Sequence, residues 1–96
     1  MHALLIAINS KYVHTALGLR YVGEYAKAQG FDTHLIEETI NTPILAVLEN
    51  IMDVKAEVYA FSVHIWNKPF VYRLISMLKK LRPEATIVVG GPEVAF

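Results

Sequence analysis

The fold of this chain is decided by one short run near its end, Thr86-Ile-Val-Val-Gly-Gly-Pro-Glu-Val94. Its β-branched residues need burial on both faces, which is typical of a strand inside a parallel sheet. The run stops at Gly90-Gly91-Pro92, where paired glycines allow positive φ and let a ligand approach a backbone without a Cβ. In open α/β sheets ligands sit at the carboxyl ends of the strands, where this turn lies. The glycine pair is therefore a candidate binding turn, and the alternative is that it only ends the strand.

The rest of the chain alternates short apolar runs with amphipathic segments of helical spacing. The apolar runs predict a buried strand at Ala3–Ile8, an edge strand at Asp32–Glu37 and a third, buried strand at Val58–Val63. Helices are expected from about Thr15 to Gln29, from Pro43 to Met52 and from about Lys68 to Leu81. Right-handed crossovers in this βαβαβαβ order predict a doubly wound parallel α/β sheet of strand order 2-1-3-4, with the switch point between the first and third strands.

Single residues predict where the helices begin and end and which side they bury. The expected N-caps are Thr15, Thr42 and Asn67, because their side-chain oxygens can accept hydrogen bonds from the free backbone N–H groups at a helix start. Gly30 is expected to stop the first helix. One face of that helix is expected to be buried, made of Ala16, Leu19, Val22 and Ala26.

The chain length predicts one domain, residues 1–96. Doubly wound sheets of this kind usually have a fifth strand and a further helix, whereas the sequence stops at Phe96, just after the glycine turn. We therefore expect this chain to be the N-terminal fragment of a longer enzyme. The first helix would be the only helix on one face of the sheet and would leave part of that face uncovered. We expect the fragment to self-associate through this uncovered part.

Composition narrows the possible partners. Nine basic and nine acidic residues give no net charge, which argues against nucleic acid or an anionic membrane as the main partner. The absence of cysteine excludes a disulfide framework and an iron–sulfur cluster within these residues. The longest apolar run, Ala3–Ile8, is far too short to span a membrane, and the N-terminus does not fit a signal peptide, so a cytoplasmic protein is expected.

Two polar loops follow the first and third strands and should flank one crevice. They are Asn9-Ser10-Lys11-Tyr12-Val13-His14 and His64-Ile65-Trp66-Asn67, the second preceded by Ser62-Val63. His14 and His64 could approach each other, although two histidines without a third ligand are more typical of exposed loops than of a metal site. Trp66 either staples the start of the third helix or forms a wall for a flat ligand.

Several known chemistries do not match these loops. The glycine-rich dinucleotide fingerprint and the Walker phosphate loop are absent, and a phospho-receiver domain would need acidic residues where Asn9 and Ser62 stand. No nucleophile–base pair or carboxylate dyad can be assembled from the loops. Catalysis by these residues alone is not expected.

Three runs together resemble the N-terminal cobalamin-binding domain of cobalamin-dependent radical S-adenosylmethionine proteins. They are Asn9-Ser-Lys-Tyr-Val-His14 leading into Leu19-Arg20-Tyr21, Phe61-Ser-Val-His-Ile-Trp-Asn67, and Val89-Gly-Gly-Pro-Glu-Val94, and the likeness spans the whole chain. The resemblance implies a flavodoxin-like (Rossmann-like) domain that holds cobalamin. It also implies a separate downstream barrel, which carries a Cys-x-x-x-Cys-x-x-Cys motif for an iron–sulfur cluster, uses S-adenosylmethionine and often transfers methyl groups.

The resemblance also implies which residues touch the cofactor. Ser62 and the loop to Trp66 would line the corrin and nucleotide-tail site, and the glycine turn would let the tail pass close to the backbone. The full set expected to bind cobalamin is Asn9, Ser10, Lys11, Tyr12, His14, Ser62, Val63, His64, Trp66, Gly90, Gly91, Pro92 and Glu93.

One departure from related cobalamin domains concerns the metal. Domains that ligate cobalt through histidine carry Asp-x-His-x-x-Gly after the first strand, and the aligned positions here are Asn9, Lys11 and His14. No cobalt ligand is therefore expected from this chain. The alternatives to a cobalamin module are a docking domain that binds no cofactor and a binder of another flat, phosphate-bearing ligand such as a flavin.

Overall fold

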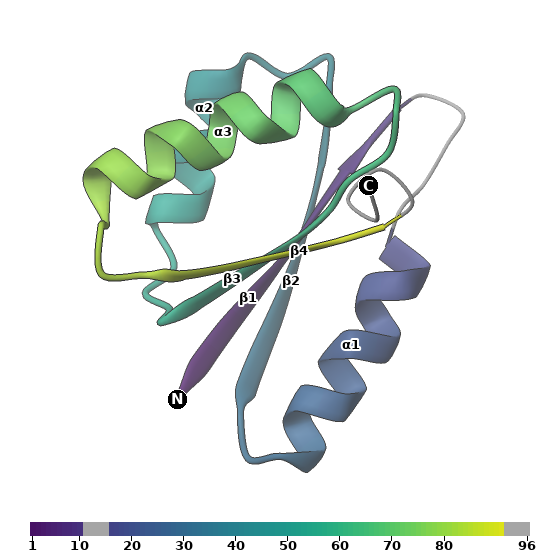
Figure 1. Cartoon of the computed structure of the whole chain (residues 1–96), viewed down its shortest axis with the longest axis vertical. Coiled ribbons are helices and arrows are strands. Elements are labelled where there is room, and N and C mark those ends of the chain that lie inside the picture. Colours follow the sequence, from purple (N-terminus) through teal and green to yellow (C-terminus); the bar gives the residue numbers. More distant parts are fainter. Residues whose placement is uncertain (11–15, 92–96) are drawn as a thin grey trace.

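The structure, a computed structural model, describes residues 1–10 and 16–91 and has four strands in one sheet with helices on both faces (Figure 1). The elements in chain order are β1 (His2–Asn9), α1 (Ala16–Ala28), β2 (Asp32–Thr39), α2 (Ile44–Met52), β3 (Val58–Ser62), α3 (Lys68–Leu81) and β4 (Thr86–Gly90). All neighbouring strands are parallel, in the order β2-β1-β3-β4. The predicted fold class and strand order are confirmed.

The core lies on both sides of β1, which is buried from Ala3 to Asn9. On one face Leu4, Ile6 and Ile8 pack against β3 and the apolar sides of α2 and α3. On the other face a smaller cluster joins Leu5 and Ala7 to Leu19 of α1 and Ala60 of β3. Complete burial of each large apolar side chain contributes about 1.5–3 kcal/mol, so the two clusters fix β1 at the centre of the sheet.

Helix α1 meets the sheet through a different face from the predicted one. Leu19 and Gly23 are buried, whereas Val22 is 48% exposed. A Cβ at Gly23 would lie 2.7 Å from Leu5 Cδ1, so glycine lets α1 approach β1 closely, and this turns Val22 outward. The prediction for Val22 is wrong; the side chain of Ala16 and the expected cap Thr15 lie outside the described residues.

The helix ends agree with the sequence only in part. Gly30 ends α1 with φ 94°, as predicted, while Phe31 N donates to Ala26 O at 3.0 Å. Helix α2 has Pro43 at the N-cap position, and the Thr42 hydroxyl lies 3.3 Å from the Thr39 hydroxyl. Thr42 is therefore not the cap, because its side chain interacts with the end of β2.

Strand β4 is less buried than its sequence predicts. Val88 is 46% exposed and Val89 is 39% exposed. The prediction of burial on both faces is wrong, because β4 lies at the edge of the sheet formed by the described strands, next to β3. Among the helices within the described ranges, none combines the length and apolar character needed to cross a bilayer.

Candidate functional site

The candidate site lies at the carboxyl ends of β1, β3 and β4, where the chain leaves the sheet in opposite directions. Helix α1 packs on one face and α3 on the other (Figure 1). Strands β1 and β3 pair from Ala3–Val58 to Ile6–Phe61, while β1 continues to Asn9. The divergence of the connections at this switch point is where open α/β sheets bind ligands.

A buried asparagine holds this divergence in place. Asn67 is 0% exposed, and its Oδ1 accepts from His64 N at 2.7 Å. Its Nδ2 donates to Ile8 O at 3.0 Å and to Ser62 O at 3.4 Å. One amide therefore joins the ends of β1 and β3 to the loop after β3.

The sequence did not reveal this role for Asn67. It stands at the N-cap position of α3, as predicted, but its side chain makes no cap hydrogen bond. The prediction that it caps the helix is wrong, because its oxygen accepts from His64 instead. The signal that could have found it is a polar residue between a switch-point strand and the helix that follows.

The two glycines of the turn have different surroundings. Gly91 has φ 106°, and a Cβ there would overlap Val63 O and lie 3.0 Å from Val63 N. Val63 N also donates to Gly90 O at 2.7 Å, so the turn packs directly on the loop after β3. A Cβ at Gly90, in contrast, would meet no atom of residues 1–10 and 16–91 within 4 Å. Gly91 is thus required by the fold itself, and Gly90 is the position that leaves open space at the strand end.

Ser62, His64 and Trp66 form a small cluster beside Gly90. Ser62 is the register partner of Gly90 at the end of β3, and its Oγ lies 3.2 Å from His64 Nε2. The His64 ring stacks on Trp66, with centroids 5.7 Å apart and planes 19° apart. The structure therefore brings these predicted site residues together around the strand ends, with the backbone of buried Val63 against the turn.

The side chain of Asn9, at the end of β1, contacts β2. Asn9 is buried, and its Nδ2 donates to Glu37 Oε1 at 3.3 Å. Glu37 also forms an ion pair with Arg20 of α1, at 3.7 Å. Ser10 is half-buried beside Asn9. The remaining predicted site residues, Lys11, Tyr12, His14, Pro92 and Glu93, lie outside the described residues, so the approach of His14 to His64 stays a prediction.

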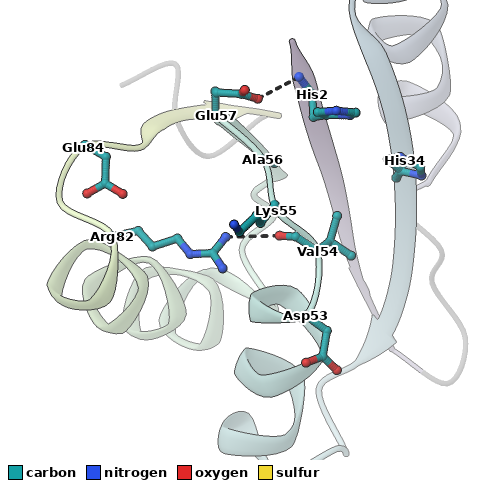
Figure 2. Close-up of a pocket in the computed structure, with 9 residues that line it drawn as sticks. All are labelled: His2, His34, Asp53, Val54, Lys55, Ala56, Glu57, Arg82 and Glu84. Atoms are coloured by element: carbon teal, nitrogen blue, oxygen red, sulfur yellow. Dashed lines mark hydrogen bonds between the residues drawn. The ribbon is translucent and has the colours of Figure 1, made fainter.

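A hollow of about 730 Å³ lies at the opposite end of the sheet and is lined by charged side chains (Figure 2). Arg82 donates there to Met52 O at 2.9 Å and Val54 O at 3.1 Å, and also to the Tyr59 hydroxyl. Glu57 accepts from His2 N at 2.7 Å, and this hydrogen bond lowers the pKa of Glu57. These groups hold the chain together at the amino ends of the strands, whereas open α/β sheets bind ligands at the carboxyl ends.

Arg82 gives a first test of this distinction between the two ends. Arg82→Ala should lower the free energy of unfolding by about 2–3 kcal/mol, because hydrogen bonds from a charged donor contribute about 1.5–3 kcal/mol and the C-terminal carbonyls of α2 lose their cation. Denaturant unfolding measures this change. Arg82→Lys keeps the charge but lacks the planar guanidinium, so its stability should lie between those of the wild type and of Arg82→Ala. An unchanged unfolding midpoint in Arg82→Ala would contradict the structural role of Arg82.

Neither end of the sheet has a candidate metal site: residues 1–10 and 16–91 contain no group of three or more His, Cys, Asp or Glu side chains that could hold an ion.

Comparison with protein families gives a match to a family model described as the B12 binding domain, over residues 3–96. The matched range runs from β1 through the glycine turn. No curated protein matches the sequence.

Proposed function

The chain belongs to the B12-binding domain family, and we propose that it binds cobalamin at the carboxyl ends of β1, β3 and β4. The observation that carries this proposal is that, among the described residues, nothing fills the space at Gly90, next to the Ser62–His64–Trp66 cluster. The residues fit the cofactor because a glycine admits a ligand close to the backbone and flat side chains suit a flat macrocycle. Asn67 holds the ends of β1 and β3 at fixed positions.

Each side chain then has a binding role, with no chemical step of its own. The Ser62 hydroxyl can donate to or accept from a polar group of the cofactor, since its partner His64 can switch tautomer. The partly buried Trp66 presents an aromatic face beside the loop. Cobalamin, when bound, would supply a cobalt centre able to carry a transferable alkyl group. The chain would orient that centre and limit its exposure to water.

Titration with hydroxocobalamin tests the proposal directly. Trp66 is the single tryptophan, and its fluorescence should be quenched when the coloured cofactor binds. Gly90→Val adds a side chain in the open space while suiting a strand, so we expect affinity to fall at least about tenfold, or about 1.4 kcal/mol.

The matched control is Thr86→Val, an exposed position at the other end of the same strand, which should bind like the wild type. Flavin mononucleotide serves as the competing ligand. Unchanged cobalamin affinity in a folded Gly90→Val would contradict the proposed position, and tighter binding of the flavin would favour the alternative cofactor. Absence of binding to either ligand would favour the docking-domain alternative.

We expect cobalt to receive no nitrogen from this chain. Lys11 occupies the position of the ligating histidine, and a lysine ammonium has no lone pair to donate. The rival is His64, whose Nε2 lies 3.2 Å from Ser62 Oγ. Uniform ¹⁵N labelling of the protein separates its nitrogens from those of the cofactor in the paramagnetic resonance spectrum of Co(II). The superhyperfine pattern should be the same with and without the label. A label-dependent splitting that disappears in His64→Ala would contradict this prediction.

We further propose that the domain is the N-terminal module of a radical S-adenosylmethionine enzyme, such as a methyltransferase. The likeness of the three runs at the strand ends supports this, and such an enzyme would bind S-adenosylmethionine and its cluster in another domain, since residues 1–96 contain no cysteine. The catalytic barrel would be the partner of this domain in the same polypeptide. The reading frame after Phe96 tests the proposal: a Cys-x-x-x-Cys-x-x-Cys motif would support it, and an open frame of several hundred codons without one would refute it.

A further inference from the structure

A chain of three polar side chains crosses from β1 through β2 to α1 near the carboxyl ends of the strands. Asn9 of β1 donates through Nδ2 to Glu37 Oε1 of β2 at 3.3 Å. The other oxygen of the same carboxylate, Oε2, lies 3.7 Å from Nη2 of Arg20 on α1. One glutamate therefore connects the end of the central strand to the helix that packs on this face of the sheet.

The register of the sheet places this chain of contacts on the same face as part of the candidate site. Residues two apart in a strand share a face, so Asn9 lies with Ala7 on the side that packs against α1. Ser62 lies with Ala60 on that side, and Gly90 is the register partner of Ser62. The Asn9 side chain and the space proposed for cobalamin are therefore on one face of the sheet, at the same end.

The carboxylate of Glu37 decides which way the Asn9 amide faces. A carboxylate can only accept hydrogen bonds, so the amide must turn its NH2 group toward Glu37. The amide oxygen, Oδ1, is then on the side away from Glu37. Asn9 is 4% exposed, so water cannot easily compensate for an amide that is turned the other way.

We propose that Glu37 is a positioning residue of the cobalamin site, which acts through the direction of the Asn9 amide. This inference rests on the proposed function. Asn9 is too buried to cover much of a cofactor, so its contribution is to hold the end of β1, where Ile40 N also donates to Asn9 O at 2.9 Å. A reversed amide would place a donor where an acceptor now lies, and the end of β1 would have to shift.

Glu37→Gln reverses the amide with almost no change of shape. Arg20 can only donate, so the new amide turns its oxygen to Arg20 and its nitrogen to Asn9. The Asn9 oxygen must then accept, and Nδ2 takes the place of Oδ1. Hydroxocobalamin affinity, followed by Trp66 fluorescence, should fall about threefold to tenfold, the range for one neutral hydrogen bond. Circular dichroism should show an unchanged fold.

A second substitution, Arg20→Met, supplies the rescue. In Arg20→Met/Glu37→Gln no cation holds the glutamine oxygen, so this oxygen can accept from Asn9 again and the affinity should recover. A purely structural role for Glu37 predicts the opposite order, because the double variant loses more contacts than Glu37→Gln alone. The matched control is Glu24→Gln, the same change in a glutamate of α1 that is ion-paired with Lys27 at 3.7 Å, and it should bind like the wild type.

The outcomes separate this inference from the proposed function. Wild-type affinity in Glu37→Gln would overturn the inference alone, as would a double variant that binds more weakly than Glu37→Gln. An equal loss of affinity in Glu24→Gln would also overturn it, because the effect would then be one of net charge. Absence of cobalamin binding by the wild type would overturn the proposed function and this inference together.

Discussion

Asn67→Ala should lower the free energy of unfolding by about 2–4 kcal/mol, because it leaves buried backbone groups without partners. The lost amide serves His64 N, Ile8 O and Ser62 O, and the side chain is 0% exposed, so water cannot easily replace it. The strand ends should also separate, and cobalamin affinity should fall in the protein that remains folded. Chemical denaturation with circular dichroism measures the first effect.

Asn67→Asp sharpens the same test. It keeps an acceptor for His64 N but turns a donor into a second acceptor, which faces the carbonyl oxygens of Ile8 and Ser62. Burial and these oxygens raise the pKa of the new carboxyl group, so the native state holds its proton more tightly than the unfolded state. Stability should therefore fall as pH rises above the unfolded pKa and recover on acidification. A loss below about 0.5 kcal/mol in Asn67→Ala would show that the amide does not hold the strand ends together.

The second large effect is expected at Gly91. Gly91→Val combines a left-handed backbone, which costs about 1–2 kcal/mol in a residue with a Cβ, with overlap against Val63 O. We expect the free energy of unfolding to fall by about 2 kcal/mol or more, because the turn must detach from the loop after β3 and lose the Val63–Gly90 hydrogen bond. Thermal unfolding measures the change.

Gly90→Val is the matched comparison at the neighbouring position. A Cβ at Gly90 meets no described atom within 4 Å, so stability should change little while cobalamin affinity falls. The pair separates a glycine required by the fold from a glycine that admits a ligand. Equal loss of stability in both variants would contradict the distinction.

Much of the fold follows from local pattern. The continuous apolar run of β1 predicts a central strand, and the order of strands and helices predicts the 2-1-3-4 sheet, both of which the structure confirms. The charged, alternating run of β2 predicts an edge strand, and its place in the sheet agrees. These features depend on burial over several residues, which sequence periodicity reports directly.

The missed details depend on contacts between distant residues. The buried face of α1 is set by Gly23 against Leu5, and helical spacing alone pointed to Val22. Glycine is required at position 91 because a Cβ there would overlap the backbone of Val63. Asn67 donates to the carbonyl of Ile8, which lies 59 residues away in the chain. For the same reason the sequence could place Ser62, His64 and Gly90 at strand ends but could not say which side chains contact each other.

The most direct test of the central claim is amide chemical-shift mapping of the ¹⁵N-labelled chain during titration with hydroxocobalamin. We predict the largest changes at Ser62–Asn67 and at Gly90, with small changes at the opposite end, around Asp53–Glu57 and Arg82. Largest changes at that opposite end, or none anywhere at saturating cofactor, would contradict a cobalamin site at the carboxyl ends of the strands.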